Sequence, residues 1–493
     1  MAGLAAATLV AVPRTAHAEP VFTVDSTLDQ IDADPGDGVC ATAAGTCTLR
    51  AAIMQANRVS GIGATIRVPS GVYTLTRPRT AAGGELDGDL DITTQASGQP
   101  FIRIIGDGSA STIIDANQID RVLTIQPWRV VTLQGLTLRN GHVDGDGGAI
   151  ESLGHLTLHD VAVQGSRARG SGGCLFASAT LDITSSRIID CESEWYGGGI
   201  FAYAGITMES SAVNASTATM GGGLTIVGAP AWIRNSRFRG NSASYGGGAI
   251  QSAAPSLWIG DSTLSENESG SEGGGIFVGA NGSLRLERSA VIGNAGLKGG
   301  GLYVGTGASA VVVNSTLGRN VADRDGGAVE NDGTIRFHNS TLSFNHADPG
   351  GQDLGRGGGL NATGPAYARN TILAGNLRGA EEPNDCHGVV RTYGRTLFGT
   401  SADCALDAVS GTVEALSPGS LGTLGNHGGR TATVPLLAGS NAIDSGDLDG
   451  GCHDDAAPLD RDQRGYERVG VCDIGAFEYG AFDPDEIFRH GFE

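Results

Sequence analysis

One short pattern recurs through the middle of the chain and constrains its architecture more than any other feature. After each glycine cluster comes a large apolar residue, at intervals of 25, 25, 24, 26, 26, 26, 27 and 31 residues. These apolar residues are Ile150, Leu175, Ile200, Leu224, Ile250, Ile276, Leu302, Val329 and Leu360. An upstream asparagine keeps a similar period, at Asn241, Asn267, Asn294, Asn320, Asn345 and Asn376. Two independent markers with one period indicate a repeat protein.

Each repeat contains three short apolar runs, for example 276–278, 284–286 and 290–292. Such runs are long enough for strands and too short for helices. Three strands per repeat, separated by Gly, Asn and Ser, predict a coil whose successive turns pair through parallel strands. We therefore predict an all-β right-handed parallel β-helix, a solenoid of about 12 coils.

The repeated polar residues have a structural explanation in such a coil. Glycine allows the sharp corners, and a stacked asparagine can bond its amide to the asparagine of the next coil. We expect a recurring serine to bond local backbone at another turn, at Ser236, Ser262, Ser289, Ser315 and Ser340. A phosphate-binding loop is excluded because no Gly-Lys-Ser/Thr follows the glycines.

The ends of the chain differ from its middle. Residues 65–140 contain similar short apolar runs but lack the glycine marker. The repeat period is lost near residue 380. We predict a β-helix over 65–378, an N-terminal cap over 19–64, a C-terminal cap over 379–480 and a tail over 481–493, because solenoids need atypical ends to cover their cores.

The N-terminus and the charge indicate export. Residues 1–18 combine a short apolar run with a small-residue cleavage site, as in a secretory signal peptide. No later segment is long and apolar enough to span a membrane as a helix. The net charge of −21 argues against nucleic acid as a partner.

The eight cysteines fall as four neighbouring pairs, which predicts local disulfides in an oxidising compartment. A metal site would need CxxC-type spacing, which is absent. The predicted disulfide residues are Cys40, Cys47, Cys174, Cys191, Cys386, Cys404, Cys452 and Cys472.

Three segments resemble known families of exported bacterial proteins. The stretch Cys47-Thr48-Leu49-Arg50-Ala51-Ala52-Ile53 resembles the CSLREA motif, with Thr48 and Ala51 departing from it. The repeats are similar to the paired GGA[ILV] and FxxN signatures of polymorphic outer-membrane proteins, matched by 247–250 and 238–241. The segments 440–444, 462–465 and 472–478 resemble the choice-of-anchor Q domain.

These resemblances imply a secreted or surface protein of a Gram-negative bacterium, with a solenoid of the pectin-lyase-like kind. Polymorphic outer-membrane proteins end in a β-barrel, but only a short tail follows residue 478, so we expect no such barrel. The tail at 487–493 resembles short tails of other exported proteins, for which we weigh a sorting or anchoring role against a frayed end.

Acidic clusters offer the one candidate cofactor, Ca²⁺. Asp87, Asp89 and Asp91 alternate in GELDGDLD and would share one face of an extended segment. Solvated turn carboxylates are the alternative, also for two other clusters: Asp32, Asp34 and Asp37, and Asp454, Asp455, Asp460 and Asp462.

Aromatic residues offer candidate ligand contacts. Trp232 and Trp258 are 26 residues apart, one coil, so we expect them to stack on one face as a binding stripe. Packing against a loop is the alternative. Trp195, Tyr196 and Tyr245 are further candidates.

No catalytic constellation is recognisable, so the leading hypothesis is a structural or adhesive protein that binds polysaccharide or cell-surface ligands. Because parallel β-helices often carry pectin-active enzymes, a polysaccharide lyase or glycoside hydrolase with non-standard residues is the first alternative. An inert envelope spacer is the second. The sequence leaves the ligand, the attachment mode and the oligomeric state open.

Overall fold

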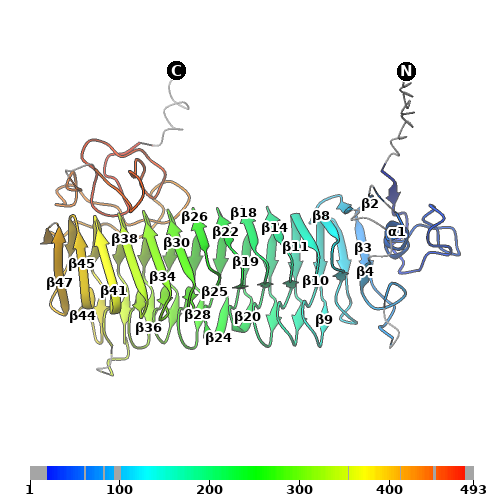
Figure 1. Ribbon diagram of the computed structural model, residues 1–493, viewed down its shortest axis with the longest axis horizontal. Coiled ribbons are helices and arrows are strands. Elements are labelled where there is room, and N and C mark those ends of the chain that lie inside the picture. Colours follow the sequence, from blue (N-terminus) through cyan, green and yellow to red (C-terminus); the bar gives the residue numbers. More distant parts are fainter. Residues whose placement is uncertain are drawn as a thin grey trace, which may run out of the picture.

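The chain winds into an elongated right-handed parallel β-helix (Figure 1). The computed structural model describes residues 19–59, 61, 63–80, 84–93, 101–352, 355–410, 412–447 and 451–482. The solenoid has roughly 11 turns, close to the number predicted. The predicted signal peptide and all but two residues of the predicted tail lie outside the described residues.

Each regular coil contains four strands, one more than the sequence predicts. Three of them belong to a 37-stranded sheet, and the fourth belongs to an 11-stranded sheet along the lower edge of Figure 1. The fourth strand is mostly two residues long and often polar, as in β16 (Glu192–Ser193), so hydrophobic periodicity does not reveal it.

The first strands of the coils follow the glycine corners from β10 to β41. They are β4 (Leu90–Ile92), β7 (Leu123–Ile125), β10 (Ile150–Ser152), β13 (Leu175–Ala177), β17 (Ile200–Ala202), β21 (Leu224–Val227), β25 (Ile250–Ala253), β29 (Ile276–Val278), β33 (Leu302–Val304), β37 (Val329–Asn331), and the first residues of β41 (Leu360–Arg369) and β45 (Cys386–Tyr393). The second strands include the remainder of β41 and β45, with β1 (Val21–Thr23), β2 (Ala64–Val68), β5 (Phe101–Gly106), β8 (Val130–Arg139), β11 (His155–Gln164), β14 (Leu181–Thr184), β18 (Ile206–Glu209), β22 (Ala231–Arg234), β26 (Leu257–Gly260), β30 (Ser283–Glu287), β34 (Ser309–Val313), β38 (Thr334–His338) and β47 (Cys404–Ser410).

The third strands include the later residues of β8 and β11, with β3 (Gly71–Thr74), β6 (Thr112–Asp115), β15 (Arg187–Ile189), β19 (Ala212–Asn214), β23 (Arg237–Arg239), β27 (Thr263–Ser265), β31 (Ala290–Ile292), β35 (Thr316–Gly318), β39 (Thr341–Ser343), β42 (Thr371–Ala374), β46 (Thr396–Phe398) and β48 (Val413–Ala415). The fourth strands are β9 (His142–Val143), β12 (Arg167–Ala168), β16, β20 (Thr217–Met220), β24 (Ser242–Gly246), β28 (Glu268–Ser269), β32 (Ala295–Gly296), β36 (Val321–Ala322), β40 (His346–Ala347), β43 (Leu377–Arg378) and β44 (Glu382–Pro383).

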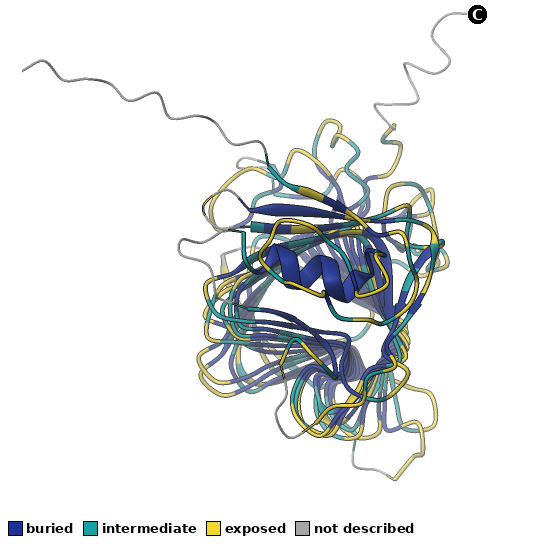
Figure 2. Cartoon of the chain, turned by 90° about the vertical axis from the view of Figure 1, so that its right-hand side faces the viewer, coloured by how far each residue is buried: buried dark blue, intermediate teal, exposed yellow. Residues whose placement is uncertain are grey.

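The apolar markers of the repeat form columns inside the solenoid. Ile250 pairs in register with Ile276, and Ile276 with Leu302, and all three side chains are fully buried. Equivalent residues of successive coils therefore stack as a continuous core, seen as the dark blue interior in Figure 2. Each coil buries its apolar side chains against those of the neighbouring coils, so the apolar positions must recur at the same spacing in every coil.

The recurring asparagines form a buried ladder between the third and fourth strands, as predicted. In each, the backbone N–H and the side-chain Nδ2 both donate to Oδ1 of the next asparagine, for example Asn294 to Asn320 at 3.1 and 3.0 Å. Asp385 ends the ladder by accepting both bonds from Asn376, at 3.0 and 2.7 Å. Burial raises the pKa of Asp385 to about 6, because its hydrogen bonds do not offset the loss of solvent.

The recurring serines lie at the turn between the second and third strands. Ser236 donates its hydroxyl to the carbonyl of Arg234 at 2.7 Å and accepts the backbone N–H of Ser211 at 3.2 Å. The residue before each serine has a left-handed backbone, as at Asn235 with φ 49° and Asp261 with φ 51°. This single-residue bend turns the chain sharply and directs one side chain per coil outward.

The N-terminal segment contains a helix that the sequence analysis did not predict. Thr48 caps α1 (Leu49–Ala56) by accepting the N–H of Ala51 at 3.2 Å, and the helix lies across the end of the solenoid (Figure 2). The buried guanidinium of Arg50 pairs with Asp29 at 2.6 Å. The CSLREA-like stretch therefore builds the cover of the core.

The C-terminal region takes two paths. β45 to β48 continue the stack of strands, whereas residues 416–447 and 451–482, here called the C-terminal lobe, lie along the side of the solenoid beside the coils from β30 to β45 (Figure 1). Asp454 pairs with Arg285 at 2.6 Å, and Gln463 accepts the hydroxyl of Thr316 at 2.6 Å. The lobe therefore covers a flank of the solenoid, not only its end.

Four disulfide bonds join cysteines that are neighbours in the sequence. They are Cys40–Cys47, Cys174–Cys191, Cys386–Cys404 and Cys452–Cys472. One of them lies near the N-terminal end of the molecule and two near the C-terminal end. The fourth, Cys174–Cys191, links two corners of one coil. Over the described ranges, no helix has the length and apolar character needed to cross a membrane.

Candidate functional site

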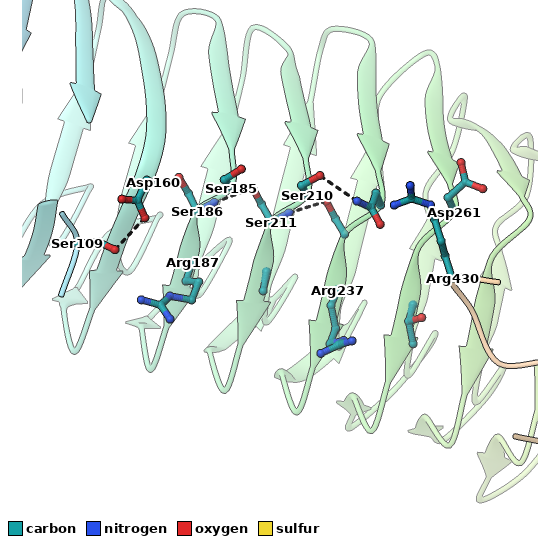
Figure 3. Close-up of a pocket in the computed structure, with 14 residues that line it drawn as sticks. Ser109, Asp160, Ser185, Ser186, Arg187, Ser210, Ser211, Arg237, Asp261 and Arg430 are labelled. Carbon is teal, nitrogen blue, oxygen red and sulfur yellow. Dashed lines mark hydrogen bonds between the residues drawn. The ribbon is translucent and has the colours of Figure 1, made fainter. Parts of the chain in front are cut away.

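A polar groove runs along the turn between the second and third strands (Figure 3). It has a volume of 570 Å³ and crosses the coils from Asp160 to Asp261. Ser109 lies at its N-terminal end, and Arg430 reaches into its other end from the C-terminal lobe. The groove therefore lies along the solenoid axis and is bounded by a loop on one side and the lobe on the other.

The turn residues supply one polar side chain per coil. The left-handed bends place Asp160, Ser185, Ser210, Asn235 and Asp261 in a row. Asn235 donates its side-chain amide to the hydroxyl of Ser210 at 2.9 Å, and Ser109 donates to Asp160 at 2.9 Å. The inner serines are different, because their hydroxyls bond backbone and are buried.

Two arginines face the groove from a single column of the third strands. Arg187 pairs in register with Ala212, and Ala212 with Arg237, so the arginines are two rungs apart, roughly 10 Å. The small side chain of Ala212 leaves the surface hollow between them. Figure 3 shows both arginines on the same side of their strands.

The guanidiniums of this groove lack acidic partners. Within the described ranges, none of Arg187, Arg237 and Arg430 forms an ion pair. Several other arginines of the solenoid are paired, as Arg239 is with Glu266 at 2.8 Å. In a protein of net charge −21, an outward row of unpaired cations is a strong local departure from the rest of the surface.

A second hollow of 340 Å³ continues the groove beneath the C-terminal lobe. Arg237 lines both hollows, and Arg239 and Arg319 line the second one. Leu424 and Ala432 of the lobe form part of its wall. The positive surface therefore extends from open solvent to the contact between lobe and solenoid.

The carboxylates that line the groove are far apart. Asp160 and Asp261 are four rungs from each other, roughly 19 Å, whereas the paired acids of glycosidases are about 5–9.5 Å apart. Asp261 is also held by Arg288 at 2.9 Å. The groove has donors and charges suited to binding, but it does not bring two carboxylates to one bond.

The predicted tryptophans are register partners on the second strands, β22 and β26. Trp232 is exposed and lines a separate hollow of 330 Å³ with His155 and Asp182, whose side chains are 3.4 Å apart. Trp258 is half-buried beside Gly260, and its indole N–H donates to Glu287 at 3.4 Å. The two rings share a face, but only Trp232 lines a cavity.

The three aspartates predicted as a Ca²⁺ site do not share one extended segment. Asp87 is half-buried and accepts from Thr80 at 2.6 Å, whereas Asp89 is buried and accepts from Thr124 at 2.5 Å. Burial raises the pKa of Asp91 to about 7, and Asp89 beside it adds to this shift. The described chain brings together no group of three His, Cys, Asp or Glu side chains arranged for a metal.

The other acidic clusters have structural partners. The amide of Gln55 donates to Asp32 at 3.2 Å and to Asp37 at 3.0 Å, which fixes the turn beside α1. Asp454 holds the C-terminal lobe to the solenoid through Arg285. In the same lobe, Asp462 is fully buried and pairs with Arg464 at 2.8 Å. These carboxylates therefore contribute to folding of the two ends.

A buried carboxyl elsewhere has a strongly shifted pKa. Loss of solvent raises the pKa of Glu330, on β37, to about 7. Its side chain is 1% exposed, accepts from Asn361 at 2.9 Å and lies 3.8 Å from the ammonium of Lys298. Because no polymer could reach it there, we assign Glu330 to the scaffold.

Sequence reasoning did not find the arginines of the groove. A signal was present, because Arg187 and Arg237 are 50 residues apart (237 − 187), which is two repeat periods of 25. The search for binding residues followed aromatic and acidic side chains instead. Arg430 carries no such signal, since only the folded lobe brings it to the groove.

The chain is similar to known β-helix proteins. A family model described as right handed beta helix region matches residues 174–364. Among solved structures, the pectate lyase Pel9A is 14% identical, with 93% of this chain and 96% of that chain covered and a TM-score of 0.36. The catalytic domain of a GH87 alpha-1,3-glucanase in complex with tetrasaccharides is 11% identical, with coverage of 81% and 70% and a TM-score of 0.31.

No curated protein matches the chain. Because both TM-scores are low, neither structural likeness bears on activity.

Proposed function

We propose that this protein is exported and binds an extended anionic polysaccharide along the groove. The observation that carries the proposal is the pair of unpaired guanidiniums, Arg187 and Arg237, two rungs apart in one polar hollow. A guanidinium donates two parallel hydrogen bonds to a carboxylate or sulfate, so each arginine can hold one acidic substituent.

The periodicity of the groove suits a polymer better than a small molecule. Each rung adds roughly 4.8 Å along the axis, close to the advance of one sugar ring in an extended hexose chain. Acidic groups on alternate sugars would meet Arg187 and Arg237 in register. The exposed turn residues Ser185 and Ser210 and the half-buried Asn235 offer hydroxyl and amide partners to the sugars between.

Several features support an extracellular setting. Four disulfides are typical of an oxidising compartment. The signal-like N-terminus and the resemblance to the CSLREA and choice-of-anchor Q families favour a secreted or surface-attached protein. A β-helix with such a groove would act there as a structural or adhesive binding protein. We propose Trp232, which lines its own hollow, as a secondary ligand contact.

Binding rather than cleavage is the activity that this geometry favours. The roughly 19 Å between Asp160 and Asp261 is too long for the paired acids of a hydrolase. The enzyme alternative therefore requires residues outside the groove, and the spacer alternative requires that the unpaired arginines bind nothing.

The test is a binding titration of the purified mature protein against polygalacturonate, alginate, heparin and uncharged dextran. We expect binding of at least one polyanion, weakened by salt, and none of dextran. Arg187→Ala and Arg237→Ala should each weaken it at least ~10-fold. Arg167→Ala is the matched control, because Arg167 is equally exposed but pairs with Glu192 on β16, away from the groove.

Two results would contradict the proposal. Equal polyanion affinity of wild type and both groove variants would remove the groove as the site, and no binding at all would favour the spacer. New reducing ends or unsaturated products in the same mixtures would establish the enzyme alternative.

A further inference from the structure

A second surface of the solenoid carries a concentration of aromatic side chains. It lies at the corner between the fourth and first strands, opposite the C-terminal lobe in Figure 1. We call it the aromatic face, and its residues are Phe176, Trp195, Tyr196, Phe201, Tyr245, Phe277 and Tyr303.

Stacked pairs form the base of this face. Phe176 and Phe201 are register partners on β13 and β17, with ring centroids 5.2 Å apart and an interplanar angle of 2°. Phe277 and Tyr303 repeat the arrangement on β29 and β33, at 5.2 Å and 10°. Such offset pairs fix ring orientation, so the face is rigid.

Exposed rings stand above this base. Trp195 is 58% exposed, Tyr196 40% and Tyr245 63%. Tyr196 also contacts Phe201, at 6.3 Å between centroids, which connects the exposed rings to the stacked ones. Large rings held open to water on a rigid base have no evident folding role.

Two of the exposed rings lie at the same corner, two coils apart. Tyr196 is paired with Met220 and Met220 with Gly246, and Trp195 and Tyr245 are the residues that precede Tyr196 and Gly246. The register of β20 and β24 shifts here, which is a bulge that re-aims the side chains near Tyr245. The backbones of Trp195 and Tyr245 are thus two rungs apart, roughly 10 Å.

The charges around this face differ from those of the groove. Glu194 precedes Trp195 in the chain, Glu272 is bridged to Gly246, the residue after Tyr245, and Glu268 is exposed on β28. The nearby cations are engaged: Arg169 pairs with Asp144 at 3.1 Å, and Lys298 with Glu330 at 3.8 Å. A polyanion would be repelled from such a surface, whereas an uncharged ligand would not.

From these observations we infer a second binding site, specific for a neutral glycan chain, on the aromatic face. The C–H-rich face of a pyranose ring is apolar and packs flat on an aromatic ring. Trp195 and Tyr245 are spaced to hold two sugars with one sugar between them. The acidic rim excludes the charged polymers that we assign to the groove. The inference does not depend on the proposed function, because it uses no residue of the groove.

Tryptophan fluorescence and affinity electrophoresis with cello-, manno- and xylo-oligosaccharides and their parent polymers test this site. We expect one neutral glycan to bind, and Trp195→Ala and Tyr245→Ala each to weaken it at least ~10-fold. Trp195→Phe, which keeps a ring, should retain most of the affinity. Trp128→Ala is the matched control, since Trp128 is 75% exposed at a different corner, between β7 and β8 of an earlier coil. Arg187→Ala should have no effect.

Three outcomes would overturn the inference. The first is that wild-type protein binds no neutral glycan of the panel. The second is unchanged affinity in Trp195→Ala and Tyr245→Ala while their unfolding midpoints match wild type. The third is that these variants convert a wild-type oligomer to a monomer in light scattering, which would make the face a contact between copies of this chain.

Discussion

Two turns of the same coil show how one backbone shape serves opposite purposes. Both contain a single left-handed residue: Gly240 at the asparagine ladder and Asn235 at the groove. At the ladder turn the residue after the bend is a buried asparagine, which recurs from Asn241 to Asn376 and bonds the next coil. At the groove turn a buried serine recurs in the same way, whereas the bend residue itself lines the groove and varies from Asp160 to Ser185 to Asn235. Burial therefore fixes the residue after each bend, while exposure leaves the bend residue free to acquire a ligand contact.

Breaking the ladder is expected to give the largest effect. Asn294→Ala removes the acceptor of the Asn267 N–H and the donor to the Leu264 carbonyl, both buried. Leaving such groups unsatisfied should lower the free energy of unfolding by about 3–5 kcal/mol. Denaturant titration measures the change. Asn235→Gly, at the open corner, is the control and should change stability by less than ~0.5 kcal/mol. Similar losses in both variants would refute the contrast.

The end of the ladder should make stability depend on pH. The folded-state pKa of Asp385 is about 6, above its ordinary 3.8, so the folded protein binds a proton that the unfolded chain releases. Stability should therefore fall as pH rises from about 4 to about 6, by about 3 kcal/mol in all. The measurement is the unfolding midpoint from pH 4 to 7. Asp385→Asn should make this segment of the profile less steep by that amount, while the raised pKa values of Asp91 and Glu330 keep part of the slope. An unchanged slope would contradict the assignment.

Changing the charge of the groove should alter binding without altering the fold. Ala212→Glu places a carboxylate between Arg187 and Arg237, where it would pair with both and displace a polyanion. We expect at least ~10-fold weaker binding. Because position 212 points outward, the free energy of unfolding should stay within ~0.5 kcal/mol of wild type. Calorimetry and denaturant titration together check this, and retained affinity would place the polymer elsewhere.

The tryptophans should give the smallest effects and differ from each other. Trp232→Ala removes an exposed ring that lines a hollow, and should weaken glycan binding about 3-fold. Trp258→Ala should leave binding unchanged, because that indole is half-buried and bonded to Glu287. The same titrations compare the two. An equal loss of glycan affinity in both variants would instead support the hypothesis that the two tryptophans form one binding stripe, as their spacing predicts.

The predictable part of the fold is the part that repeats. Period, core columns, ladder and local disulfides follow from stacking, because each coil sees the same neighbours. The fourth strand, α1 and the path of the C-terminal lobe do not repeat. In the lobe, contacts such as Asp454 with Arg285 join residues 169 apart in the chain, and no local pattern specifies them.

The candidate site was less predictable for a related reason. Trp232 and Trp258 do share a face. However, the repeat spacing predicts only which side chains stack above one another, and it does not predict whether a given side chain lines a cavity. The Ca²⁺ hypothesis assumed that 87–91 is extended, whereas the strand begins only at Leu90. Arg187 and Arg237 became candidates once ion pairing was known, since an arginine with a partner and one without look alike in a sequence.

The contacts between the C-terminal lobe and the solenoid determine where coils could be added to such a protein. The lobe joins the coils of Arg285 and Arg369 to the end of the chain, so a coil duplicated within that span would pull these contacts out of register. Coils duplicated before residue 235 would disturb none of them, nor the hollows that the lobe shares with Arg237 and Asp261. Both binding surfaces begin in that portion, so duplicated coils would lengthen their reach along a polymer one rung at a time while the C-terminal lobe keeps its contacts.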